Sequence, residues 1–454
     1  MVCAEAQRDG LSPAAMVPDP AVPYLAARSC SAAPGGPFPA GVLPMAFSHL
    51  VASTSLDLPT PDVRIPQNLS TLLTGIRRHL HMNPEIGFQE YETSRFIREI
   101  LEMHGLRVHG PLAGTGLYVD IEGAHPGRHI GYRADIDALP TPDAKTVPYA
   151  SRREGAAHLC GHDAHTAVAI GVALLLDAQR DALHGTVRVF FQPNEEGIPS
   201  GAPAMIEAGV LDGLDAVYAI HVDSSLESGR FGLLAGPITS AASQFTTTVR
   251  GPGSGHSARP HETTDTVWVA TQIATAFYQL AGRISDARDN TVITICRFRG
   301  GEAFNVIPAE VEFGGTLRCT RNEDRPFFFR RMQEIARQTA ALYGGTAEVV
   351  FSEGAPAVVN DPLLVQRAAR VIQDTLGPKA VYWIPRPSMG TEDFAHYLTH
   401  VPGLLIRVGT AAGPETSYPL HDSLFDLDEA ALAPAAQVLS RILMNHLAQA
   451  ADAP

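Results

Sequence analysis

Short apolar runs alternate with longer segments of helical period along most of the chain after Pro66, and this alternation limits the folds open to it. Runs rich in β-branched and aromatic residues, typical of strands, cover residues 116–121, 129–134, 186–192 and 216–222. Helical segments cover residues 68–81, 92–104 and 166–179. Because strands that alternate with helices form a largely parallel sheet covered on both faces, the sequence predicts an α/β domain.

The pattern changes after Gly236. Strands are expected over residues 244–250, 291–298, 309–319 and 346–352, and helices over residues 264–282 and 324–343. The resulting β-α-β-β-α-β order is that of a small ferredoxin-like α+β sandwich, in which two helices cover one face of an antiparallel sheet. We therefore expect residues 236–354 to form an inserted second domain.

The α/β pattern returns beyond that insertion, with a helix over 361–376, a strand over 404–408 and a helix over 428–447. The main domain is therefore expected to be discontinuous and to combine residues 66–235 and 355–454. A chain of 454 residues also exceeds one ordinary compact core, which agrees with two domains.

The first 65 residues are rich in Pro, Ala, Ser and Gly, and their apolar residues show no sustained period. Several prolines interrupt what would otherwise resemble the apolar core of a secretory signal. We expect residues 1–65 to be a mostly disordered extension, with translation from Met45 as an alternative start.

Charge and cysteine content exclude several classes of partner. A formal net charge of −14 argues against a surface for nucleic acid, which requires clustered Lys and Arg. The five cysteines are odd in number and widely spaced, so no disulfide framework is predicted and the reducing cytoplasm is the expected location. No apolar run approaches the roughly 18 residues of a membrane span, so no membrane partner is expected.

The strongest local motif is His-Leu-Cys-Gly-His-Asp-Ala-His at residues 158–165, directly before a predicted helix. Cys160 and His162 flank a glycine, so both side chains can turn toward one point. A thiolate and an imidazole are suitable ligands for zinc or another transition ion. The alternative interpretation, a polar helix cap with incidental histidines, suits one histidine better than this cluster, so we predict a metal site.

Further polar residues follow other predicted strands. Glu195 and Glu196 come after the strand that ends near Gln192, and His221 lies at the end of the next strand. Asp135 and Asp137 follow an earlier strand. Open α/β sheets bind ligands beyond the carboxyl ends of their strands, so these side chains are expected at one rim. His421 is a lone histidine in a loop, and pattern alone favours no role for it.

Several ordered segments resemble the M20 metallopeptidases, specifically the amidohydrolase branch with hippurate hydrolases, aminoacylases and plant auxin-conjugate hydrolases. The resemblance runs from about residue 68 to 447 and includes an opening RHLHMNPE at 78–85. The other segments are RADIDALP (133–140), HLCGHDAHTA (158–167), QPNEEG (192–197), GHSARPH (255–261), FNVIPAEVEFGGTLR (304–318), MGTEDF (389–394) and LHDSLFD (420–426).

This resemblance implies a zinc-peptidase-like catalytic domain with an inserted lid or dimerisation domain, and two divalent metal ions per subunit. The ions would be Zn²⁺ or Mn²⁺, with Co²⁺ or Ni²⁺ as alternatives. It also implies a homodimer or higher homo-oligomer formed through residues 236–354. The implied ligands are Cys160, which would bridge the two ions, and His162, Glu196, His221 and His421.

The remaining implied roles concern catalysis and the substrate. Glu195 would be the general base, and Asp135 a carboxylate that supports the metal site. His256 would be a lid histidine that stabilises the oxyanion, in several relatives across the subunit interface, and Asn305 would contact the substrate. Leu159 departs from the alanine usual in the branch, and residues 141–143 depart after RADIDALP, which puts the substrate pocket in doubt.

The expected activity is hydrolysis of the amide bond of a small N-acyl amino acid by a metal-activated water. Two alternatives stay open: a dipeptidase or carboxypeptidase of the same chemistry, and an inactive metal-binding sensor of small acids, against which the intact Glu195 argues. A zinc nucleobase deaminase is excluded because its H-x-E and P-C-x-x-C elements are absent from the sequence.

Overall fold

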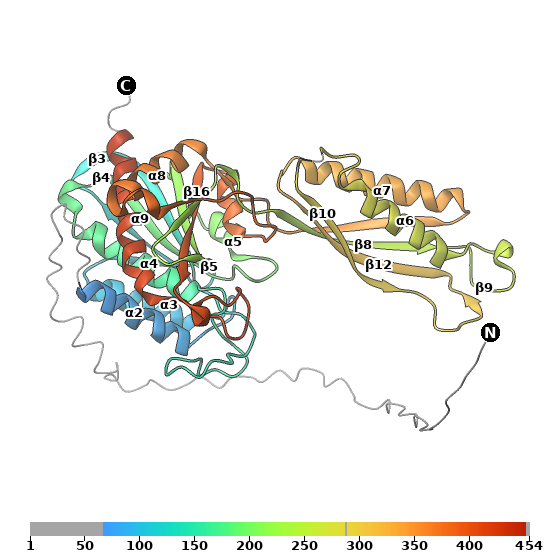
Figure 1. Cartoon of the computed structure of the whole chain (residues 1–454), viewed down its shortest axis with the longest axis horizontal. Coiled ribbons are helices and arrows are strands. Elements are labelled where there is room, and N and C mark those ends of the chain that lie inside the picture. The colour runs from blue at the N-terminus through green and yellow to red at the C-terminus, as the bar shows by residue number, and fades with distance from the viewer. Residues whose placement is uncertain (1–66, 287, 451–454) are drawn as a thin grey trace, which may run out of the picture. The chain divides into compact units, whose positions relative to one another are not determined.

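The computed structural model of the chain describes residues 67–286 and 288–450 (Figure 1). The predicted N-terminal extension, residues 1–65, lies outside these residues. Within the described residues, none of the helices combines the length and the hydropathy that a membrane span requires.

The main domain is built on an eight-stranded mixed sheet with the order β1-β2-β4-β3-β5-β16-β6-β15. Its centre, β4-β3-β5-β16, is parallel, as the alternation of strands and helices predicts. The strands are β1 (Val108–Leu112), β2 (Gly116–Glu122), β3 (His125–Asp135), β4 (His184–Gln192), β5 (Ala216–Glu227), β6 (Phe231–Leu233), β15 (Val381–Trp383) and β16 (Gly403–Ala411).

Helices cover both faces of this sheet. One face packs on a large apolar core with the helices α2 (Gln67–Met82), α3 (Tyr91–Met103), α4 (His162–Asp177), α8 (Pro362–Leu376) and α9 (Leu432–Ala450). The other face packs on α5 (Gly201–Glu207) and the 3₁₀ segment η4 (Asp393–Thr399). Nearly every side chain of α4 is buried, because this helix lies between the sheet and the helices α2 and α9.

Residues of the predicted insertion form a separate four-stranded antiparallel sheet with the order β10-β12-β8-β13. Its elements are β8 (Ala241–Arg250), α6 (Thr266–Leu280), β10 (Thr291–Arg299), β12 (Glu310–Cys319), α7 (Asp324–Leu342) and β13 (Thr346–Glu353). Alternate residues of β8 are buried, and they share an apolar core with both helices. The order of elements is the β-α-β-β-α-β order expected from the sequence. We refer to residues 241–353 as the small unit.

Two-residue strands make up the other two sheets. β9 (Gly255–His256) pairs with β11 (Val306–Ile307), and β7 (Gly236–Pro237) pairs with β14 (Val359–Asn360). The second pair joins the chain on both sides of the small unit, so the polypeptide leaves and re-enters the main domain at neighbouring positions.

The expectation that residues 1–65 are dispensable leads to a simple test. A truncated chain that starts at Pro66 should keep its full activity and melting temperature, because α2 begins at Gln67 and contributes the buried Leu69 and Leu73 to the core. Thermal unfolding and turnover of the full and truncated chains provide the comparison. A large loss of either would show that the extension packs on the folded part.

Candidate metal centre and active-site pocket

The parallel strands β3, β4 and β5 deliver the polar motifs to one rim of the sheet. Asp135 is the last residue of β3, Glu195 lies three residues beyond the end of β4, and His221 lies within β5. Because these strands are parallel, the segments that leave their carboxyl ends meet at the same edge.

The turn before α4 brings Cys160 and His162 to this rim. Gly161 separates them with φ of 88°, a left-handed conformation that glycine adopts without a steric cost. A Cβ atom at Gly161 would lie 2.3 Å from Cγ2 of Val222, so the backbone also approaches β5 too closely for any other residue. The helix consequently begins at His162, four residues earlier than its apolar pattern predicts, and it incorporates half of the motif.

All five sequence-predicted ligands lie in two overlapping groups whose ligand atoms are within 4.8 Å of one another. One group is Cys160, His162 and His221, and the other is Cys160, Glu196 and His421. The Sγ atom of Cys160 lies 3.4 Å from Nε2 of His221, and Nε2 of His421 lies 3.0 Å from Oε1 of Glu196. Cys160 belongs to both groups, which is the arrangement that a bridging ligand requires.

Hydrogen bonds orient the imidazole rings of His162 and His221, the two buried histidines among the candidate ligands. Nδ1 of His162 lies 3.2 Å from the Asp137 carboxylate, and Nδ1 of His221 donates to the carbonyl oxygen of Val222 at 2.8 Å. With Nδ1 protonated, each ring presents the lone pair of Nε2 to the site, as a metal ligand must. Nε2 of His162 is buried and without a hydrogen-bond partner among the described residues, as expected of an atom that binds a cation.

Asp135 and Asp137 stabilise the candidate ligand histidines in different ways. Asp137 contacts His162 directly and also accepts a hydrogen bond from the Glu196 backbone at 3.0 Å. Asp135 instead accepts from Nδ1 of His165 at 2.6 Å, and its carboxylate is 3.7 Å from Nε2 of His162. The sequence placed both aspartates at this rim, but the family resemblance implied a supporting role for Asp135 alone.

His421 reaches the site through an unusual backbone conformation. Its φ is +70°, which is rare for a residue with a side chain and costs energy unless the surroundings enforce it. Its backbone N–H donates to the carbonyl oxygen of Leu159 at 2.8 Å, so the loop of His421 is attached to the loop of Cys160. A strained histidine held against another ligand loop is typical of a functional position.

Glu195 lies beside these two groups, and its carboxylate also comes within 4.8 Å of ligand atoms of His162 and Glu196 on one side and of Glu392 and Asp393 on the other. Its Oε2 is 3.9 Å from Nε2 of His162, and its Oε1 accepts from the Asp393 backbone at 3.3 Å. Burial raises the pKa of Glu195 well above its usual value, and the neighbouring carboxylates of Glu392 and Asp393 raise it further. A largely enclosed carboxylate of raised basicity next to a candidate metal site is suited to take up a proton.

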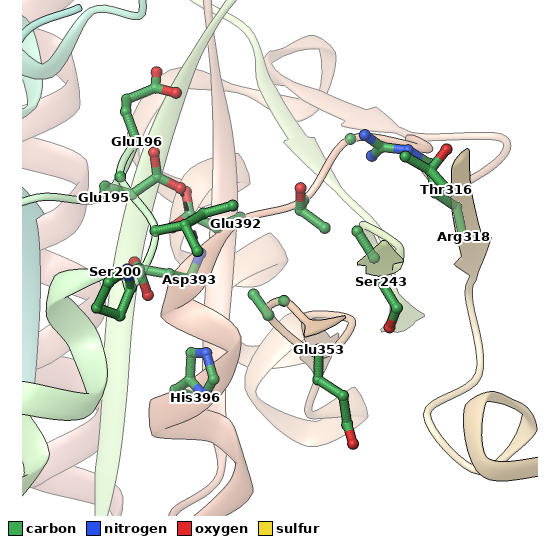
Figure 2. A pocket seen from close by; sticks show the side chains of 18 of the residues that line it. Glu195, Glu196, Ser200, Ser243, Thr316, Arg318, Glu353, Glu392, Asp393 and His396 are labelled. Atoms are coloured by element: carbon green, nitrogen blue, oxygen red, sulfur yellow. Dashed lines mark hydrogen bonds between the residues drawn. The ribbon is translucent and has the colours of Figure 1, made fainter. Parts of the chain in front are cut away.

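The sequence argument missed a buried ion cluster behind Glu195. The Arg133 guanidinium, fully buried, donates to Asp135 at 2.6 Å and to Asp393 at 2.7 Å, and lies 3.2 Å from Glu392. Arg133 thus links Asp135 to Glu392 and Asp393. These two carboxylates lie next to Glu195 (Figure 2). The motif MGTEDF contains both acids, but only the fold brings Arg133 to them.

A pocket of about 720 Å³ opens over the ligand groups and over Glu195. Residues from the main domain, among them Arg407, and from the strands β8, β12 and β13 of the small unit line it. Figure 2 shows Ser243, Thr316 and Arg318 on the side of the small unit. Nη1 of Arg318 donates to the Met389 carbonyl oxygen at 2.7 Å. The volume suits a small-molecule substrate.

His256 and Asn305 do not line this pocket. His256 is exposed on β9, and Asn305 is exposed and accepts a hydrogen bond from the Ser257 backbone. β8 runs from the pocket at Ser243 to Arg250, a length of about 23 Å, before the chain reaches β9. Within one chain, the structure therefore does not bring these two residues to the other predicted site residues.

Comparison with known proteins decides the family. Residues 131–445 match peptidase family M20/M25/M40. An N-acetyl-L-cysteine deacetylase from Bacillus subtilis is 37% identical over 378 residues, which cover 82% of this chain and 88% of the relative. The chain belongs to the M20 family. The resemblance seen in the sequence motifs is thereby confirmed, and the chain is a hydrolase like its relatives.

Two further relatives show the range of the M20 family. A thermostable carboxypeptidase 2 from Saccharolobus solfataricus is 37% identical over 358 residues, which cover 78% of this chain and 90% of that protein. The crystal structure of a dinuclear metal-binding M20 peptidase from Bacillus subtilis has a TM-score of 0.73 and 34% identity, and it covers 83% of this chain and 97% of its own. The predicted fold class is confirmed by this match.

Proposed function

We propose that this M20 family member hydrolyses the amide bond of small N-acyl amino acids. The observation that carries the proposal is the position of Glu195, a largely enclosed carboxylate that lies next to the candidate ligand atoms and lines a pocket of small-molecule size. The deacetylase relative acts on N-acetyl-L-cysteine, which belongs to this class of substrate. A purely metal-binding sensor would have no use for a base at this place.

Cys160, His162, Glu196, His221 and His421 would hold two divalent metal ions, and the orphaned Nε2 of His162 supports this assignment. Bound ions supply Lewis acidity, which lowers the pKa of water and polarises a carbonyl group. The donor set of one thiolate, three imidazoles and a carboxylate suits zinc or manganese, with cobalt or nickel as alternatives.

Glu195 would take the proton of the attacking water and return it to the nitrogen of the leaving amine. Asp137 holds the ring of His162 in the tautomer that ligation requires, and Asp135 orients His165 behind it. The Asp393 backbone N–H holds one oxygen of Glu195, so the other oxygen faces the pocket side of the ligand cluster.

A second candidate function is cleavage of peptides from their carboxyl end, because a carboxypeptidase is as similar to this chain as the deacetylase is. One panel of substrates tests both candidate activities. The purified chain, loaded with Zn²⁺ or Mn²⁺, is offered N-acetyl, N-benzoyl and indole-acetyl amino acids together with dipeptides. Release of free amino acid from the acylated compounds, at rates well above those for dipeptides, supports the proposal, and the reverse preference supports the carboxypeptidase.

We also propose that residues 236–354 are a lid domain through which two copies associate, and that His256 acts on the site of its partner. The position of β9, far along β8 from the pocket of its own chain, supports this proposal. His256 would then donate to the oxyanion of the transition state, a contact worth about 3–4 kcal/mol.

Mixing two inactive variants tests this arrangement. His256→Ala and Glu195→Gln chains are combined after subunit exchange has been demonstrated by a size or label assay. If His256 acts on the partner, each mixed dimer contains one site with both residues intact, and about half of its sites become active. Exchange without any return of activity would mean that His256 acts in its own chain or has no role.

A further inference from the structure

The turn that carries Glu195 is held by a hydrogen bond on each side of this residue. The backbone N–H of Asn194 donates to Oε1 of Glu90 at 2.9 Å, and the backbone N–H of Glu196 donates to the Asp137 carboxylate at 3.0 Å. Both carboxylates are buried. Two side chains from other parts of the chain therefore fix the backbone directly before and directly after the proposed base.

Asn194 has a backbone conformation that needs such support. Its φ is +52°, in the left-handed region that residues with a side chain rarely adopt. Two glycines approach its side chain closely, since a Cβ at Gly87 would lie 1.7 Å, and a Cβ at Gly197 2.1 Å, from Oδ1 of Asn194. Its Nδ2 donates to the carbonyl oxygen of Pro199 at 2.7 Å. A strained residue persists only where its surroundings enforce the conformation, so the shape of the turn depends on these contacts.

The carboxylate of Glu90 does not serve the helix that it precedes. Glu90 is the N-cap residue of α3, but its side chain makes no capping hydrogen bond. The N–H of Thr93, in the first turn of α3, donates instead to Glu85 at 2.8 Å. The stability of this helix therefore gives no reason for a carboxylate at position 90.

Hydrogen bonds alone compensate the buried charge of Glu90. Its side chain is fully buried, and among residues 67–286 and 288–450 it forms no ion pair. Its oxygens also accept from the Phe88 backbone at 3.0 Å and from the Thr115 hydroxyl at 2.7 Å. A buried carboxylate without a cation costs free energy, and burial accordingly raises the pKa of Glu90. Of its three partners, only Asn194 belongs to the turn that carries Glu195.

We propose that Glu90 is a positioning residue for catalysis, which sets the direction of Glu195 by accepting the hydrogen bond from Asn194. This inference rests on the proposed function, in which Glu195 is the base, and it adds a residue outside the pocket and outside the ligand groups. Asp137 holds the backbone after Glu195, so Glu196 keeps its place when Glu90 is changed. Loss of the contact between Glu90 and Asn194 should therefore slow proton transfer and leave metal binding intact.

Glu90→Met removes the acceptor and keeps most of the volume of the side chain. On the metal-loaded chain, kcat for an N-acyl amino acid should fall by about 10- to 100-fold, because a misplacement of about 1 Å costs this much in rate. KM and metal content should change little. Glu90→Gln should recover most of the rate, since its amide oxygen still accepts from Asn194 and its amide nitrogen can donate to Thr115. Glu90→Asp, which keeps the charge but is one methylene group shorter, should lose rate like Glu90→Met and decides the test if Glu90→Met does not fold.

Glu85→Met is the matched control, because it also removes a buried carboxylate from the segment before α3. Glu85 accepts from Thr93 and pairs with Arg153 at 3.2 Å, and both partners lie outside the turn that carries Glu195. This variant should lower the melting temperature, as Glu90→Met does, and keep kcat close to the wild-type value. A near-normal kcat in Glu90→Met and Glu90→Asp, or an equal loss of kcat in Glu85→Met, overturns the proposal.

Hydrogen exchange separates this proposal from the proposed function, because it needs no turnover. In the wild-type chain the Asn194 N–H is buried and hydrogen-bonded, so it should exchange slowly. In Glu90→Met, peptides that cover residues 193–197 should exchange about 10-fold faster, the value of one hydrogen bond to a charged group, while peptides of α4 keep the wild-type rate. Faster exchange confined to this turn supports the proposal, even if none of the N-acyl compounds is hydrolysed. Unchanged exchange in the turn overturns it, even if they are.

Discussion

Replacing Glu195 by glutamine should lower kcat by about two to four orders of magnitude, the usual contribution of general acid–base catalysis. Glutamine keeps the size of the side chain and can still accept the hydrogen bond from the Asp393 backbone, but it cannot take up a proton from water. Metal content and the KM for substrate should therefore change little. Turnover and metal content are measured on the same preparation.

The same substitution at the neighbouring Glu196 provides the matched comparison for Glu195→Gln. Glu196→Gln should weaken metal affinity, because Glu196 belongs to a ligand group with Cys160 and His421. Part of its lost activity should therefore return when the metal concentration is raised, whereas that of Glu195→Gln should not. A near-normal kcat in Glu195→Gln would contradict the assigned mechanism. Equal metal rescue of both variants would show that Glu195 is a ligand rather than the base.

Replacing Arg77 by methionine should reduce the free energy of unfolding by about 3–5 kcal/mol, the usual cost of removing one partner from a buried ion pair. Arg77 on α2 is fully buried and donates to Asp163 at 2.9 Å, to Asp426 at 2.7 Å and to Glu429 at 3.2 Å. Burial alone would raise the pKa of Asp163, but Arg77 and then His81 outweigh it and hold this pKa far below its usual range. The variant leaves these carboxylates without their shared cation.

Arg78 is the control, because it pairs with the same Glu429 from the surface, with 45% of its side chain exposed. Arg78→Met should cost no more than about 1 kcal/mol. Denaturant unfolding of both variants and the wild type gives the comparison. Equal, small losses for Arg77→Met and Arg78→Met would mean that the buried cluster contributes little to stability. Since Asp163 follows His162, a proposed metal ligand, Arg77→Met should also bind metal less tightly.

The regular elements of the fold were predictable because their apolar residues repeat with the period of a helix or a strand. α2, β4 and α7, for example, lie within two residues of their expected bounds. The last two strands at one end of the sheet, β6 and β15, have three residues each and were not predicted, because three residues carry no measurable period. The early start of α4 depends on the left-handed Gly161, which the apolar pattern does not reveal.

The candidate site was predictable where ligand-type residues cluster in sequence, as around Cys160, and where strands end. His421 was the weakest case from pattern alone, and only its resemblance to a family motif indicated a role. Arg133 and Asp393 were not predicted as partners, because 260 positions separate them and neither residue type is unusual by itself. Arg407 was missed for a related reason: its place beside His221 follows from strand order, which periodicity does not reveal.

The central claim is that five side chains hold the metal ions on which hydrolysis depends, and removal of metal tests it most directly. The chain is stripped with a chelator and titrated with Zn²⁺ or Mn²⁺ while metal content and hydrolysis of an N-acyl amino acid are followed together. The account predicts that the stripped chain is inactive, that activity returns as two ions bind per chain, and that Cys160→Ser and His162→Ala bind clearly less metal and stay inactive. Full activity in the stripped chain, or full metal content with normal activity in both variants, would contradict it.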